Sequence, residues 1–345
     1  MTVVVKLGTS LVAGPGGRVR RRVLDARARE IAALVRGGEP VAVVSSGAIA
    51  LGLPFLGLER RPRSVPKLQA ASALGQGRLQ RAWEQALGRE GVHAAQVLLT
   101  ASDVADRAAY VHARNALQEL LALGAVPIVN ENDATATDEI AFGDNDALAA
   151  HVALLVRARL LLLLTEVEGV YTQAPGTPGA ELVTDGSAAT EAAFGEPSRL
   201  GRGGMQSKVL AAQMAAAGGI PTVIASGTGP SVVPQILAGE PHGTRFRGDG
   251  AALSGYKVWL RFGRPVVGRI HVDSGAHRAV ARESKSLLAV GVVSCEGHFT
   301  AGDAVELVAP DGAAFAKGIA GASGTEIVRR PHGLEAVHRD RLVVY

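Results

Sequence analysis

Over residues 1–225, short apolar runs alternate with longer segments in which apolar residues recur at helical spacing. Each run is apolar on successive residues, which predicts a strand buried on both faces. The predicted strands are 3–7, 41–44, 95–100, 126–129, 160–164 and 221–225, and the predicted helices end near residues 36, 90, 123, 158 and 217. This alternation indicates a parallel sheet covered by helices.

The pattern changes at residues 227–255, where Gly, Pro and Ser interrupt it, and we place the domain boundary there, with domains at 1–254 and 255–345. Beyond it helical spacing largely disappears. Short strands are predicted between Gly and Asp turns at 258–260, 268–272, 291–295, 304–308 and 342–344. A module of about 90 residues with this pattern is typical of a small β-barrel or sandwich.

Composition narrows the class of protein. A single cysteine, Cys295, excludes a disulfide framework and a cysteine-based zinc site, so we expect a reducing cytoplasm. No apolar stretch reaches membrane-spanning length, and the first residues do not form a signal peptide. The net charge of +4 is mild for 345 residues and neither demands nor excludes an anionic partner.

The segment 126–151 concentrates polar residues between a strand and a helix. The predicted strand is followed by four polar residues, from Asn130 to Asp133. Asn145 and Asp146 directly precede the next predicted helix. One Asn or Asp would suffice as the helix cap. The excess predicts a polar pocket, although a solvated acidic loop is the alternative.

Two other predicted strands end in small residues. Gly8, Thr9 and Ser10 follow the first strand, and Ser46 and Gly47 follow the second. Open α/β sheets bind ligands in the crevice outside the carboxyl ends of their strands. We therefore expect these turns to line the pocket.

Lysine is rare in this chain, and two of its six lysines end glycine-marked stretches. Lys208 closes 203–208 at a predicted helix start, where free N–H groups and an ammonium favour a polyphosphate. Lys6 at the end of the first strand is a second candidate phosphate clamp. The alternatives are a flexible glycine linker and a lysine snorkelling from an edge strand. No Walker A motif occurs.

These features favour phosphoryl transfer, which needs positioning and charge neutralisation more than covalent help. No nucleophile elbow, paired metal-ligand histidines or reactive cysteine environment is evident. His151, one helical turn beyond Asp146, is expected to pack rather than to act as a base. A carboxylate acceptor is already ionised at neutral pH and needs no base.

Five motifs in this order resemble the glutamate 5-kinase family of the amino-acid kinase superfamily. They are 6–10 (KLGTS), 45–49 (SSGAI), 130–134 (NENDA), 142–146 (FGDND) and 203–208 (GGMQSK). Residues 257–345 resemble a PUA domain, including its closing 336–340 (AVHRD). The resemblance implies a three-layer αβα sandwich with a mostly parallel central sheet, followed by a small all-β PUA-like barrel domain.

The resemblance also implies a reaction and a site. ATP would phosphorylate the γ-carboxylate of L-glutamate to L-glutamyl 5-phosphate for proline biosynthesis, with Mg²⁺ carried mainly on phosphate oxygens. Lys6, Asp146 and Lys208 would be catalytic, and Ser46, Asp133 and Asn145 would bind glutamate. No residue is assigned to a metal. The nucleotide would be held by Lys6, Thr165, Glu166, Arg202, Gly203, Gly204, Met205, Gln206, Ser207 and Lys208.

The family further implies a homo-oligomer, dimer or tetramer, and a glutamyl phosphate reductase as a candidate partner. This sequence departs from the family at three positions: Glu166 replaces an Asp, Arg202 a Thr, and Ala141 a basic residue.

Two alternatives remain. The first is another carboxylate kinase, acting on aspartate or N-acetylglutamate; Asp133 disfavours an N-acylated substrate, which has no cation for it to pair with. The second is an RNA-binding protein acting through residues 257–345. This segment contains twelve Lys and Arg and nine Asp and Glu, and its basic residues do not form an obvious stripe.

Overall fold

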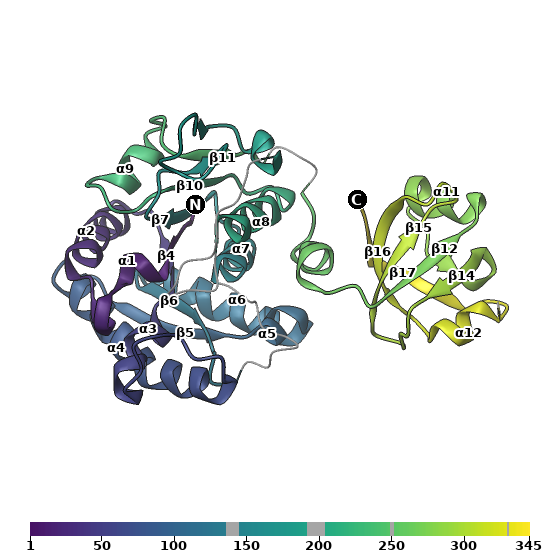
Figure 1. Ribbon diagram of the computed structural model, residues 1–345, viewed down its shortest axis with the longest axis horizontal. Coiled ribbons are helices and arrows are strands. Elements are labelled where there is room, and N and C mark those ends of the chain that lie inside the picture. The colour runs from purple at the N-terminus through teal and green to yellow at the C-terminus, as the bar shows by residue number, and fades with distance from the viewer. Residues whose placement is uncertain (136–144, 192–203, 249–251, 330) are drawn as a thin grey trace. The chain divides into compact units, whose positions relative to one another are not determined.

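The computed structural model describes the chain except residues 136–144, 192–203, 249–251 and 330. The chain divides into two compact units, Met1–Ala252 and Leu253–Tyr345 (Figure 1). Each is described by itself below.

The first unit is built on a seven-stranded sheet with the order β11-β10-β7-β1-β4-β6-β5. All neighbours are parallel except β10 and β11, so the prediction of a mostly parallel sheet is confirmed. The strands are β1 (Val3–Leu7), β4 (Val41–Ser45), β5 (Ala94–Leu99), β6 (Val126–Glu131), β7 (Leu160–Thr165), β10 (Thr222–Ser226) and β11 (Thr244–Phe246). Every strand expected in this region is present within two residues.

Helices cover both faces of this sheet (Figure 1). On one face lie α2 (Arg21–Arg36), α4 (Val65–Gly88) and α9 (Val232–Leu237), and on the other lie α6 (Arg107–Ala122), α7 (Asn145–Val156) and α8 (Met205–Ala217). The three-layer sandwich expected from the sequence is therefore confirmed. The shorter elements are α1 (Thr9–Val12), β2 (Ala13–Gly14), η1 (Pro15–Gly17), β3 (Arg18–Val19), α3 (Ala48–Gly52), η2 (Leu53–Leu56), α5 (Ala101–Ala105), β8 (Val170–Tyr171), β9 (Leu182–Val183) and η3 (Gly186–Glu191).

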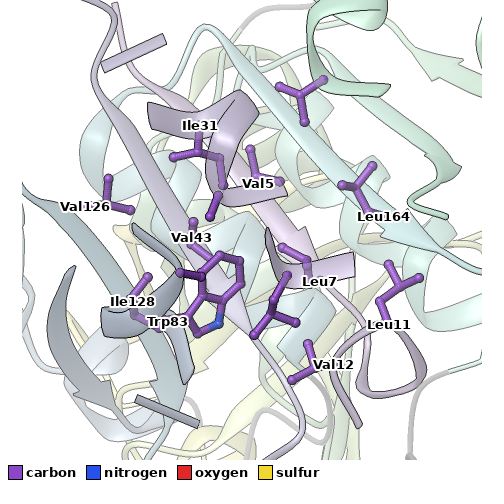
Figure 2. Packing of buried hydrophobic residues seen from close by; sticks show 14 of the residues in the cluster. Val5, Leu7, Leu11, Val12, Ile31, Val43, Trp83, Val126, Ile128 and Leu164 are labelled. Atoms are coloured by element: carbon purple, nitrogen blue, oxygen red, sulfur yellow. The ribbon is translucent and has the colours of Figure 1, made fainter. Parts of the chain in front are cut away.

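The alternation of side chains along β1 assigns its residues to the two faces. Val3, Val5 and Leu7 join the hydrophobic core beneath α2 and α4 (Figure 2), so Lys6 points to the opposite face, toward α7 and α8. Trp83 of α4 is fully buried in that core, and its indole N–H donates to Ser45 Oγ at 2.9 Å. The core therefore holds the carboxyl end of β4 in place.

Residues 227–248 are more ordered than the sequence suggested. The Gly, Pro and Ser of this segment form turns around α9 and β11, and β11 adds an antiparallel edge strand to the first sheet. Two short elements separated by turn residues give too little periodicity to be recognised from sequence.

The second unit contains a six-stranded sheet with the order β13-β17-β16-β15-β12-β14. Its elements are α10 (Gly255–Val258), η4 (Trp259–Gly263), β12 (Gly268–Val272), α11 (Ser274–Glu283), β13 (Leu287–Leu288), η5 (Ala289–Gly291), β14 (Val292–Glu296), β15 (Ala304–Val308), β16 (Ala314–Ala320), α12 (Gly324–Val328) and β17 (Glu335–Val344). A separate hydrophobic core lies among them.

Several expectations for this unit were wrong or incomplete. The predicted strand at 258–260 is helical, because three buried apolar residues fit a helix as well as a strand. The sequence also missed α11, β13, β16 and α12, and the predicted strand 342–344 covers only the end of β17. Helix α11 buries Val280 and otherwise consists mostly of small and polar residues, so few large apolar side chains mark it in the sequence. Asp273 caps its start by accepting from Ala276 N–H at 2.8 Å.

Candidate active site

The carboxyl ends of the central strands lie at one edge of the sheet and are joined by backbone hydrogen bonds. Gly8 N–H donates to Leu164 O at 3.2 Å, and Ser46 N–H donates to Leu7 O at 3.1 Å. Gly47 has a φ of +116°, a conformation that glycine adopts without strain, and it turns the chain from β4 into α3. The turns expected to line one crevice are therefore adjacent.

One buried carboxylate joins two lysines that are distant in sequence. Lys6 Nζ donates to Asp146 Oδ1 at 2.5 Å, and Lys208 Nζ donates to Asp146 Oδ2 at 3.0 Å. All three residues are buried: Lys6 is 2% exposed, Lys208 is 6% exposed and Asp146 is 0% exposed. The structure thus brings together the three residues expected to be catalytic.

Their positions follow from different local causes. Lys6 lies on β1, the central strand of the sheet, so the alternative of an edge-strand lysine is wrong. Asp146 lies in the first turn of α7, where the helix dipole favours a negative charge. Lys208 lies in the first turn of α8, where the dipole disfavours an ammonium, so helix stability does not explain its presence there.

Among the residues that the structure describes, the ion pairs of this cluster join two ammonium groups to one carboxylate. This arrangement favours an anionic guest. Ser207 Oγ lies 3.1 Å from Asp146 Oδ2 and 2.9 Å from Gly204 O, so the α8 start is attached to the same carboxylate. The geometry suits an anion placed beside α8.

A chain of side-chain amides lies beside this cluster. Asn145 Nδ2 donates to Ser46 Oγ at 3.0 Å and to Asn130 Oδ1 at 2.7 Å. Asn130 Nδ2 donates in turn to Gln76 Oε1 of α4 at 2.8 Å. Two of the residues expected to bind substrate, Ser46 and Asn145, are therefore in direct contact.

The third, Asp133, follows β6 and is reached from the same helix. Its Oδ2 accepts a hydrogen bond from Ser72 Oγ at 2.8 Å. Ser72 and Gln76 are four residues apart on α4, so they lie on one face of the helix. Helix α4 thus contacts the polar groups on both sides of the expected substrate site.

The residues expected to bind nucleotide follow β7 and begin α8. Glu166 Oε1 accepts from Arg20 Nη1 at 2.7 Å, and the same Arg20 nitrogen donates to Ser10 O at 2.6 Å. This pair is about half exposed. Thr165 ends β7, and Gly204 to Lys208 span the start of α8. Arg202, Gly203 and the Ala141 position lie outside the described residues.

His151 is buried within α7, and desolvation lowers its pKa from 6.5 to about 4. The imidazole is therefore neutral at physiological pH and packs inside the protein. Among the described residues, no group of three or more His, Cys, Asp and Glu could hold a metal ion. In the same residues, no helix is long and apolar enough to cross a membrane.

Comparison with known proteins places the chain in a family. Residues 1–226 match the model of the amino acid kinase family, and residues 268–340 match the PUA domain. Glutamate 5-kinase of Citrifermentans bemidjiense is 40% identical, and glutamate 5-kinase of Burkholderia multivorans is 42% identical. Each alignment covers 99% of this chain and 97% of the relative. The chain belongs to the glutamate 5-kinase family.

A solved structure of isopentenyl phosphate kinase shares the fold of the first unit. It has a TM-score of 0.50 and 22% identity, and the match covers 71% of this chain and all of that one. The amino-acid kinase fold inferred from five motifs and the PUA domain inferred from residues 257–345 are therefore confirmed.

Sequence reasoning missed several residues that contact the site. Asn130 lay within a recognised motif but was given no role, and Ser72, Gln76 and Arg20 were not considered. Ser72 and Gln76 did leave a signal, because they are polar residues four apart on the otherwise small and apolar face of a long helix. Arg20 gave none among the many arginines of its segment.

Proposed function

We propose that this protein transfers the γ-phosphoryl group of ATP to the γ-carboxylate of L-glutamate, giving L-glutamyl 5-phosphate and ADP. The observation that carries this proposal is the buried carboxylate of Asp146, which holds two ammonium groups from β1 and α8 at one point. Membership of the glutamate 5-kinase family supports the choice of substrate.

In the reaction, an oxygen of the ionised γ-carboxylate attacks the γ-phosphorus as the bond from phosphorus to the β,γ-bridging oxygen breaks. Lys6 and Lys208 would neutralise the charge on the transferring phosphoryl group and on the ADP that leaves. Asp146 would hold both ammonium groups in position before the substrates bind. No proton has to be removed from the acceptor.

The substrate would lie against the polar residues that follow β4 and β6. Asp133 would pair with the α-ammonium of glutamate, and Ser46 would donate to a carboxylate. Asn145 would donate to the ligand by exchanging one of the two hydrogen bonds that its Nδ2 makes to Ser46 Oγ and Asn130 Oδ1. Ser46 Oγ already accepts from Asn145, which leaves its own hydrogen available to an anionic ligand. Thr165, Glu166 and the 202–208 segment would hold the nucleotide.

Mg²⁺ would accompany ATP, bound mainly through phosphate oxygens. Both oxygens of the Asp146 carboxylate accept hydrogen bonds from lysines, so a metal held by Asp146 does not fit this site. The ion would screen the phosphate charge alongside the two lysines.

The product would be a mixed anhydride that water hydrolyses, so rapid consumption by a reductase in the same compartment is expected. We accordingly propose glutamyl phosphate reductase as partner. From the single cysteine we propose a cytoplasmic location, and from the family resemblance a homo-oligomer of two or four copies. Size-exclusion chromatography with light scattering would test the assembly.

The substrate is tested by incubating the purified protein with ATP, Mg²⁺ and hydroxylamine, which converts an acyl phosphate into a coloured hydroxamate. L-Glutamate should give hydroxamate, and N-acetylglutamate and L-aspartate should give far less. A comparable or greater yield with either analogue would contradict the proposed substrate and favour another carboxylate kinase.

A further inference from the structure

Helix α4 contributes two polar side chains to the substrate side of the site, and neither belongs to the residues expected to bind substrate. Ser72 donates to Asp133, and Gln76 accepts from Asn130. Both are buried, at 4% and 9% exposure. Their contacts end on groups that flank the proposed glutamate position.

Gln76 fixes the direction of a chain of three amides. Because Gln76 Oε1 accepts from Asn130 Nδ2, Asn130 Oδ1 faces Asn145 and accepts from its Nδ2. Asn145 Oδ1 then accepts from the backbone N–H of Glu131 at 3.3 Å, and Asn145 Nδ2 also reaches Ser46 Oγ. Reorienting the Asn130 amide would break two of these bonds, so Gln76 determines how Asn145 and Ser46 are presented.

The place of α4 is fixed by contacts between backbones. A Cβ added at Gly75 would lie 1.8 Å from Ala48 O, and one added at Gly52 would lie 1.8 Å from Ala71 O. Helices α3 and α4 therefore touch through glycine, immediately next to Ser72 and Gln76. Since α3 directly follows the turn at Ser46 and Gly47, this contact holds α4 against the crevice.

Fold stability does not explain the glutamine. Gln76 Nε2 is buried and has no hydrogen-bond partner in the part of the chain that the structure describes, which costs about 1–3 kcal/mol for an amide group. An apolar side chain of similar length would avoid that cost but would leave Asn130 Nδ2 without its acceptor, so the glutamine brings no clear net gain in stability. Buried polar groups are normally hydrogen-bonded, and exceptions such as Gln76 Nε2 are expected at functional sites.

We propose that Gln76 is a positioning residue that sets the affinity for the amino-acid substrate through Asn130 and Asn145, without taking part in phosphoryl transfer. This inference rests on the proposed function. Gln76 contacts none of Lys6, Asp146 and Lys208 by any hydrogen bond that the structure describes, so substrate binding and transfer should separate in its variants.

The test compares Gln76→Met with Gln80→Met in the full-length protein. Gln80 is the matched control because it lies one turn further along α4 and is 7% exposed, but its Nε2 donates to Glu84 rather than to the amide chain. Gln76→Met should raise the KM for glutamate about tenfold, the effect of one hydrogen bond in a network. Its kcat and its KM for ATP should stay within about twofold of the parent values, measured at a temperature where both proteins are fully folded.

Gln80→Met should leave the KM for glutamate unchanged. An equal rise in both variants, or a loss of kcat at unchanged KM in Gln76→Met, would overturn the inference. If the parent protein uses aspartate or N-acetylglutamate instead, the proposed function fails, but the same separation is then expected with that acceptor. If it phosphorylates none of the three, both proposals fail.

Discussion

At the scale of single residues, the site depends on charges held inside the protein at fixed positions. Asp146 is fully buried between two lysines, and Asp133 is partly buried beside Ser72. The two aspartates thus have different partners: lysines for Asp146 and a serine hydroxyl for Asp133. Their substitution by the nearly isosteric asparagine should separate the phosphoryl side of the site from its amino-acid side.

Asp146→Asn should lower kcat about 10²- to 10³-fold, a loss typical for a group that organises transition-state charge. The two ammonium groups would repel each other without the carboxylate and leave their positions. The KM for glutamate should change little. Steady-state kinetics with both substrates checks this, and a change confined to KM would show that Asp146 binds substrate instead.

Asp133→Asn is the comparison. Losing the charge that pairs with the α-ammonium should raise the KM for glutamate by more than it lowers kcat. The same hydroxamate assay measures both variants under identical conditions. Equal kinetic profiles for the two variants would contradict the separate roles proposed for these aspartates.

His151 gives a prediction for the pH dependence of stability. Its folded pKa of about 4 lies below the value of 6.5 in an unfolded chain, so between these values the unfolded state binds more protons. The histidine therefore destabilises the fold as the pH falls from 6.5 to 4, by about 3 kcal/mol in total. His151→Gln should remove this part of the acid sensitivity. Urea unfolding at several pH values measures the free energy of unfolding of both proteins. If the two free energies fall in parallel as the pH is lowered, His151 is not the cause of the acid sensitivity.

At the scale of elements, the close contact of α3 and α4 controls the site from outside it. Gly52 and Gly75 let the two backbones meet, and this places Ser72 and Gln76 within reach of β6 and the residues after it. A larger residue at the contact would force the helices apart. Short side chains such as Ser72 would then no longer reach their partners.

Gly75→Ala should destabilise the protein by about 1–3 kcal/mol, because its methyl group would overlap Ala48 O. Gly77 is the matched control, since a Cβ there meets no atom within 4 Å. Gly77→Ala should stabilise the same helix by up to about 1 kcal/mol. Denaturant unfolding distinguishes the two, and similar effects would mean that α3 and α4 do not pack as described.

At the scale of the whole molecule, the chain forms two units, each with a hydrophobic core of its own. The core of the second unit is accompanied by a buried cation. Lys317 is 4% exposed, and its ammonium donates to the carbonyls of Arg261, at 3.1 Å, and of Arg264. Burial lowers the pKa of Lys317. This contact fixes the turn that follows η4.

Lys317→Met should leave these carbonyls without their donor and destabilise the second unit by about 1–3 kcal/mol. Kinase activity at 25 °C should stay at the parent level, because the proposed active site lies in the first unit. Calorimetry and the hydroxamate assay on the same samples test both statements. Loss of activity before any loss of structure would show that the second unit contributes to catalysis.

Much of this protein was determined by local sequence. Runs such as 160–164 are apolar on every residue and can only be stable where both faces are covered, so the parallel sheet and its helices followed from pattern alone. Five short motifs gave the family and the residues of the proposed site. Residues 258–260 were misread as a strand because three successive buried apolar residues fit either element, and α11 was missed because most of its residues are small or polar.

Tertiary structure decided which distant residues meet. The separation of Lys6 from Asp146 and Lys208 along the chain carries no information about contact. Only the folded structure brings β1 to the first turns of the two helices that bear them. The roles of Ser72 and Gln76 were equally hidden, because they depend on how closely two helices approach through glycine. Periodicity records which face of an element is buried, but not which other element covers it.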